Sequence, residues 1–238
     1  MSELSAAVDQ WFLDNVEDRP PDGMLHPSSM SGCWRQAVYE ARGTEPSNTK
    51  DVRNYRIMWF GSRIHEVLQQ ALEGLPGFAS EVEVAPPGWP VQGSADAIYI
   101  IGEWPADGDP ETSMDVIAYE LLELKSITPF RIKSKDLPQD HHVKQARIYM
   151  WGLNKMGTLV VQARVVYASR DDMALREFVI ERDEEWEAEF EQDLDISRAL
   201  YLKEGQTMLP PRLDLNAPEG WLCKYCQFQT KCWEVDDA

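Results

Sequence analysis

The sequence predicts an α/β fold in which helices flank a mixed central sheet. Two observations support this class. Apolar residues recur at helical spacing near both ends of the chain, whereas its middle alternates as strands do. With 238 residues, 43% of them hydrophobic, the chain can also bury one sizeable core. We therefore expect a single domain over residues 1–238, with a helical N-terminal part (1–75), a core with the sheet (76–182) and a C-terminal helix and cysteine cluster (183–238).

The N-terminal part of the chain is expected to be helical. Helical spacing covers residues 2–18, 33–42 and about 50–73. A Pro/Gly-rich turn at 19–23 ends the first helix, and Gly43 ends the second. On the third, Gly61 precedes His65 by about one turn and would permit a close backbone approach.

Strands follow in the middle of the chain. We expect strands at 78–85, 91–101 and 116–127, interrupted by Pro86-Pro87-Gly88 and by an acidic loop at 102–113. The remaining pattern predicts a helix at 141–156, strands at 159–168 and 175–180, and a charged helix at 183–202. From residue 210 the chain is predicted to be rich in loops, and this part holds the three clustered cysteines.

The charge balance limits the possible partners. The net charge of −18 argues against a long, unspecific duplex-binding face, because phosphates need local positive potential. The acidic stretches 107–115 and 181–195 are expected to be solvated surface. No secretory signal or membrane-spanning run is visible, so we expect a cytoplasmic protein without membrane contact (host cytoplasm, if it is viral).

The four cysteines suggest one shared site. Cys33 stands alone, while Cys223, Cys226 and Cys232 form C-x2-C-x5-C near the C-terminus. In a reducing compartment such thiols bind metal more readily than they form disulfides. A shared site requires the two ends of the chain to meet. Four thiolates can hold Zn²⁺ or an iron–sulfur cluster.

Charged residues within an apolar strand mark a second site. Glu123 and Lys125 are two apart, so both side chains lie on one face of the strand, with Leu122 and Leu124 on the other. If the neighbouring strand pairs with this one, Asp96 can converge with Glu123 on Mg²⁺ or Mn²⁺. Lys125 would stand beside the metal. A structural ion pair is the alternative.

Helical polar residues add to this second site. His65 lies on the third predicted helix, and Gln145 and Tyr149, at i and i+4, share one face of the helix after the E-x-K strand. Ordinary packing also explains such residues.

Together these residues resemble the RecB-like branch of the PD-(D/E)XK nucleases, whose pattern is a helical His, G-x-x-D, E-x-K and Q-x-x-x-Y. Here the pattern reads His65, Gly93-Ser-Ala-Asp96, Glu123-Leu-Lys125 and Gln145 to Tyr149. Members with an iron–sulfur cluster also carry one cysteine before the core and C-x2-C-x5-C after it. Ala95 replaces the proline of the superfamily name, and the acidic loop and the negative charge depart from the family pattern.

The resemblance extends from Cys33 to Cys232 and is greatest to the CRISPR-associated single-domain exonucleases, with nuclease domains of recombination and replication helicases also similar. It implies a restriction-endonuclease-like core and a 4Fe–4S clasp joining the two ends, with Zn²⁺ as the alternative. It implies Mn²⁺ or Mg²⁺ at the second site. The implied metal ligands are His65, Asp96, Glu123 and the Leu124 carbonyl; Lys125 would act in catalysis with Asp96 and Glu123, and Gln145 and Tyr149 would support the site or the substrate. Arg131 and Lys133 directly follow the E-x-K strand in a stretch where basic and aromatic residues mix, which suits binding of single-stranded DNA.

The implied activity is that of a metal-dependent DNA exonuclease. Single-stranded DNA and 5′-to-3′ polarity fit the family, in recombination and repair, replication or CRISPR adaptation. One alternative is a module that binds or processes DNA ends for a partner integrase or helicase. Another alternative is an interaction protein whose two ends are joined by zinc and in which the E-x-K pattern occurs by chance. Homo-oligomer formation is left open.

Overall fold

The computed structural model describes residues 2–15, 20–48, 51–105, 115–203, 205–213 and 220–234. Within these ranges, no helix combines the length and apolarity that a bilayer crossing requires.

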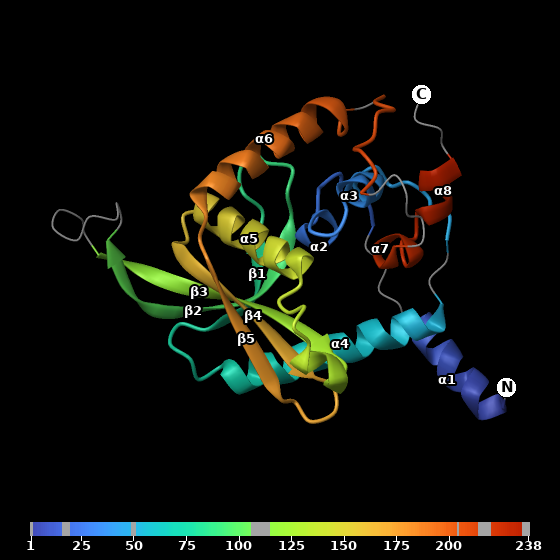
Figure 1. The fold of residues 1–238 in the computed structure, drawn as a ribbon, viewed down its shortest axis with the longest axis horizontal. Helices are drawn as coiled ribbons and strands as arrows, with labels where there is room; N and C mark the ends of the chain where they lie inside the picture. The colour runs from blue at the N-terminus through green and yellow to red at the C-terminus, as the bar shows by residue number, and fades with distance from the viewer. Residues whose placement is uncertain are drawn as a thin grey trace.

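A five-stranded mixed sheet, in the order β1-β2-β3-β4-β5, forms the centre of the described chain (Figure 1). β3 and β4 are parallel, and all other neighbours are antiparallel. A parallel pair needs a crossover connection, which α5 (Asp140–Lys155) provides. The strands are β1 (Ala79–Val84), β2 (Gly93–Pro105), β3 (Asp115–Ile127), β4 (Val160–Ser169) and β5 (Leu175–Glu181). The predicted mixed sheet with flanking helices is confirmed.

Two helices cover opposite faces of the sheet. α4 (Val52–Leu72) packs through Leu68 on one face, where Leu122 and Leu124 of β3 are buried. α5 packs on the other face against Leu121 and Tyr167. Side chains alternate along a strand, so Glu123 and Lys125 lie on the α5 face. Both leucines were predicted on the opposite face, and the structure confirms this.

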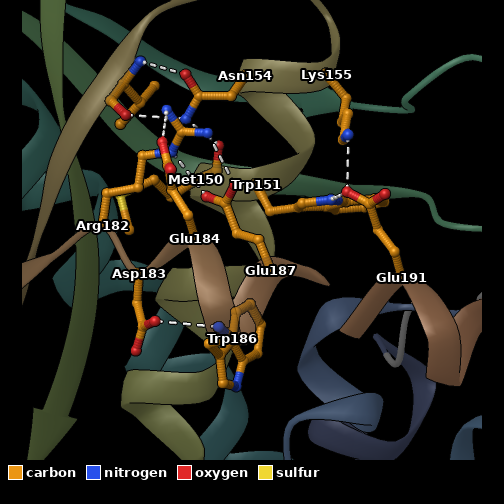
Figure 2. Close-up of polar contacts among 11 residues, drawn as sticks. Met150, Trp151, Asn154, Lys155, Arg182, Asp183, Glu184, Trp186, Glu187 and Glu191 are labelled. Carbon is orange, nitrogen blue, oxygen red and sulfur yellow. Dashed lines mark hydrogen bonds and ion pairs between the residues drawn. The ribbon is translucent and has the colours of Figure 1, made fainter. Parts of the chain in front are cut away.

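α6 (Glu184–Leu200) is attached to α5 by polar contacts (Figure 2). The indole of Trp151 donates to Glu191 at 2.9 Å, and Lys155 forms an ion pair with the same carboxylate at 2.7 Å. Arg182 donates two hydrogen bonds of 2.9 Å to Glu187, which is buried. The prediction that 181–195 is solvated surface is therefore wrong at Glu187, because an arginine from the preceding strand end allows this carboxylate to be buried.

The N- and C-terminal parts of the chain meet, as the cysteine pattern predicts. The amides of Ser47 and Asn48 each donate to the Gln227 carbonyl at 2.9 Å. The amides of Thr230 and Lys231 donate to the Asn48 and Ser47 side chains at 2.9 and 3.0 Å. Figure 1 shows the corresponding elements side by side: α2 (Pro27–Met30), α3 (Trp34–Ala41), α7 (Trp221–Lys224) and α8 (Gln229–Glu234).

Several predicted boundaries differ from the structure. α1 (Glu3–Asp14) ends before the predicted residue 18, and residues 16–19 lie outside the described ranges. β2 continues to Pro105, into the predicted acidic loop, and 106–114 lie outside the described ranges. α2 and the 3₁₀ helix η1 (Pro129–Lys133) are too short to produce a periodic signal. The expectation for Gly61 is wrong, because an added Cβ there would meet Ser126 Oγ at an ordinary 3.5 Å.

Candidate active site

The site forms where β2 and β3 separate. Their register includes the pair Ala97 and Leu122, with Asp96 just beyond it on β2. There the amide of Leu124 donates to Asp96 Oδ2 at 2.6 Å. The carboxylate thus satisfies a strand amide, and this fixes the Asp96 side chain beside β3.

His65 approaches Asp96 from α4. Its Nδ1 lies 3.4 Å from Asp96 Oδ1, and the two side chains are 24% and 16% exposed. A helix on one face and a strand edge therefore bring together two of the predicted metal ligands. The Leu124 residue, predicted to contribute its carbonyl, is held here through its amide.

Glu123 and Lys125 form a buried pair. Lys125 Nζ lies 2.5 Å from Glu123 Oε1, and the Glu123 side chain is 1% exposed. Burial raises the pKa of Glu123 from an ordinary 4.5 to about 7; Lys125 opposes this rise and the negative charge of Asp96 adds to it. Burial alone would lower the pKa of Lys125, but Glu123 and Asp96 outweigh it and the pKa is raised. At neutral pH the lysine is therefore an ammonium.

α5 brings its two predicted residues to the same region. Gln145 Oε1 accepts a hydrogen bond from Lys125 Nζ at 3.2 Å. Tyr149 is buried against Gly93, where an added Cβ would lie 3.0 Å from the tyrosine ring and 2.9 Å from Pro27. The glycine of G-x-x-D is thus required for the tyrosine of Q-x-x-x-Y to pack on β2.

Sequence reasoning missed three further polar residues near Lys125. The hydroxyl of Tyr167, fully buried, accepts from the Gln139 amide at 3.0 Å and lies 2.8 Å from His142 Nδ1. Burial and then Lys125 lower the pKa values of both His141 and His142, the latter to about 2. Both imidazoles are therefore neutral at pH 7. The only sequence signal was the position of the two histidines, four and three residues before Gln145 on the same helix.

Arg131 and Lys133 follow β3 in η1 and are exposed. The charge of Arg131 contributes to the lowered pKa values of His141 and His142, which places it near the site.

The residues present fit a hard divalent cation. Both carboxylate oxygens of Glu123 are buried; Oε1 is paired with Lys125 Nζ, and Oε2 has no hydrogen-bond partner among the described residues. Such oxygens are costly to bury unless something binds them, and Asp96 and His65 supply further donors of the type that Mn²⁺ accepts. Within the described ranges, no three or more His, Cys, Asp or Glu side chains already stand arranged as a metal-binding group.

The four cysteines line one cavity, at the junction of the chain's two ends. Burial raises the pKa of Cys33, and burial together with repulsion from the other three thiolates raises that of Cys226 to about 11. A bound cation would relieve this repulsion. Four thiols facing one cavity fit a thiolate-ligated metal or cluster.

Comparison with known proteins establishes the fold. No family model matches the chain, and no curated protein does. The crystal structure of SSO0001 is similar, with a TM-score of 0.54 and 20% identity over 97% of this chain and 96% of that one. An alkaline exonuclease (LHK-Exo) from Laribacter hongkongensis aligns with a TM-score of 0.48 and 17% identity, over 80% of this chain and 91% of that one. The chain shares its overall fold with SSO0001.

Proposed function

We propose that the protein is a metal-dependent deoxyribonuclease of the RecB-like PD-(D/E)XK type. The observation that carries the proposal is the buried Glu123 carboxylate, which stands beside Asp96 and Lys125: Oε1 is paired with Lys125 Nζ, and Oε2 is buried without a hydrogen-bond partner among the described residues. A buried structural ion pair would be expected to satisfy its remaining lone pairs. A cation site explains why this one does not.

His65, Asp96 and Glu123 would hold Mn²⁺ or Mg²⁺, which supplies Lewis-acid polarisation of the phosphate and of water. Lys125, kept charged by its carboxylate neighbours and oriented by Gln145, offsets the negative charge that develops on the phosphate.

The substrate is proposed to be single-stranded DNA, degraded from the 5′ end. The exposed Arg131 and Lys133 provide local positive charge next to the catalytic strand, where a single strand can be bound despite the net negative charge of the chain. Polarity and a role beside an integrase or helicase rest on the family resemblance.

The cysteine site is proposed to hold a 4Fe–4S cluster that joins the two ends of the chain. All four cysteines line one cavity, as such a cluster needs. Anaerobically purified protein should be brown and contain about four iron atoms per chain. A colourless, fully active protein with one zinc would contradict the cluster.

The nuclease proposal is tested with labelled single-stranded DNA and Mn²⁺. Asp96→Ala and Lys125→Ala should each lose at least about 100-fold in cleavage rate. Lys155→Ala, which removes a lysine paired with Glu191 on α6, should cleave like the parent. Parental rates for both site variants would refute an enzyme at this site. Inactive parent protein that still binds DNA ends would favour the binding module.

A further inference from the structure

Glu81 has a backbone conformation that its sequence does not explain. Its φ is +49°, in the left-handed region that side chains other than glycine rarely adopt. It lies within β1, between Ser80 and Val82, which pair regularly with Ala97 and Ala95 of β2. Asp96 is therefore the residue of β2 opposite Glu81. A strained residue next to a site residue indicates that the surrounding structure holds it there for a reason.

The Glu81 carboxylate joins two neighbouring elements. Oε1 accepts from Gln69 Nε2 of α4 at 2.8 Å, and Oε2 accepts from Ser94 Oγ of β2 at 2.9 Å. Both oxygens of this strained residue are therefore hydrogen-bonded. A surface glutamate of a strand would normally point into solvent.

Gln69 transmits this contact to Asp96. Its side-chain nitrogen also donates to the Asp96 carbonyl at 2.9 Å, and the residue is 9% exposed. An amide nitrogen has two hydrogens, and here one goes to Glu81 and the other to Asp96. The Glu81 carboxylate thus fixes which end of the amide faces Asp96.

α4 consequently holds Asp96 at two points. His65 and Gln69 are one turn apart on the same face of the helix. His65 lies at the Asp96 carboxylate and Gln69 at its backbone carbonyl.

We propose that Glu81 and Gln69 are positioning residues, which hold the backbone of Asp96 so that its carboxylate is preorganised for the divalent cation. The inference rests on the proposed function, in which Asp96 is a metal ligand. Residues that orient a ligand without touching the metal commonly change metal affinity or activity by about 10- to 100-fold when they are removed.

The test uses alanine and glycine at two glutamates of the same strand. Glu83 is exposed, pairs with Ser94 in register, and serves as the matched control. The variants are Glu81→Ala, Glu81→Gly, Glu83→Ala and Glu83→Gly in the full chain. For each, the Mn²⁺ dissociation constant, the melting temperature without metal and the single-stranded DNA cleavage rate are measured.

Both Glu81 variants should bind Mn²⁺ about 10- to 100-fold more weakly and cleave more slowly by a similar factor, whereas both Glu83 variants should stay within about twofold of the parent. The melting temperatures of the glycine and alanine variants should rank in opposite order at Glu81 and at Glu83. Glu81→Gly should melt about 2–4 °C above Glu81→Ala, because glycine adopts a positive φ without strain. Glu83→Gly should melt below Glu83→Ala, because glycine weakens an ordinary strand.

Gln69→Ala should weaken Mn²⁺ binding by a similar factor, and adding it to Glu81→Ala should cause little further loss, since the two residues act in one chain of contacts. Parental Mn²⁺ affinity and cleavage in both Glu81 variants would overturn the proposal while the proposed nuclease stands. A parent that neither binds Mn²⁺ nor cleaves DNA would overturn the proposed function and this inference together.

Discussion

Replacing Glu123 by glutamine should remove a specific pH dependence from the stability of the metal-free protein. Burial raises the pKa of Glu123 from 4.5 to about 7, so the folded protein binds this proton more tightly than the unfolded chain. Between these two pH values the free energy of unfolding should therefore fall as the pH rises, by about 1.4 kcal/mol per pH unit. Across the whole window this group alone destabilises the fold by about 3 kcal/mol.

The assay is urea denaturation of chelator-treated parent and Glu123→Gln protein at half-unit steps from pH 4.5 to 8. Other groups titrate in this range. The pKa values of His141 and His142 are lowered, so the stability that these neutral histidines contribute to the fold is lost as the pH falls. Both histidines are common to the two proteins, so the difference between them reports Glu123 together with Lys125, whose raised pKa depends on the Glu123 charge. If plots of the free energy of unfolding against pH stay parallel for parent and Glu123→Gln protein, Glu123 does not carry a raised pKa and the reasoning is refuted.

Three further changes test contacts of the site and of α6, each by urea denaturation. Gly93→Ala should lower the free energy of unfolding by about 1–3 kcal/mol, because the added Cβ overlaps with the buried ring of Tyr149. Gly74→Ala, with open space at its Cβ, should leave the free energy of unfolding unchanged, and equal effects of the two changes would contradict the packing role of Gly93. Tyr167→Phe should lower the free energy of unfolding by about 1–3 kcal/mol, because it removes the β4 hydroxyl that contacts the start of α5. An unchanged denaturation midpoint would show that these contacts do not stabilise the fold. Arg182→Met should cost a similar amount by leaving the buried Glu187 unpaired, and a loss below about 0.5 kcal/mol would show that this carboxylate is solvated.

Much of the site could be predicted from local sequence rules. The period of two along a strand places Glu123 and Lys125 on one face, and the pairing of consecutive strands brings Asp96 to them. The i to i+4 spacing of a helix places Gln145 on the face that reaches Lys125. These predictions need only neighbouring residues and one assumption about strand pairing.

Other parts depend on long-range structure. Tyr167 reaches the site because β4 lies parallel beside β3 in register with Lys125, and single-strand periodicity does not specify a parallel neighbour. The positive φ of Glu81 is a property of the folded backbone and leaves no compositional signal, since glycine is absent there. Glu187 lies in a run of acidic residues typical of a solvated surface, and its burial depends on Arg182, whose contact with it forms only in the folded chain.

The most direct test of the central claim is anomalous diffraction from crystals soaked with Mn²⁺. A metal held by this site should give a peak within about 2.5 Å of oxygen atoms of Asp96 and Glu123, with His65 adjacent, and the peak should be absent from crystals of Asp96→Ala. Crystals of a DNA-cleaving protein with no peak there, or with manganese bound only elsewhere, would contradict the assignment of this carboxylate pair as the catalytic metal site.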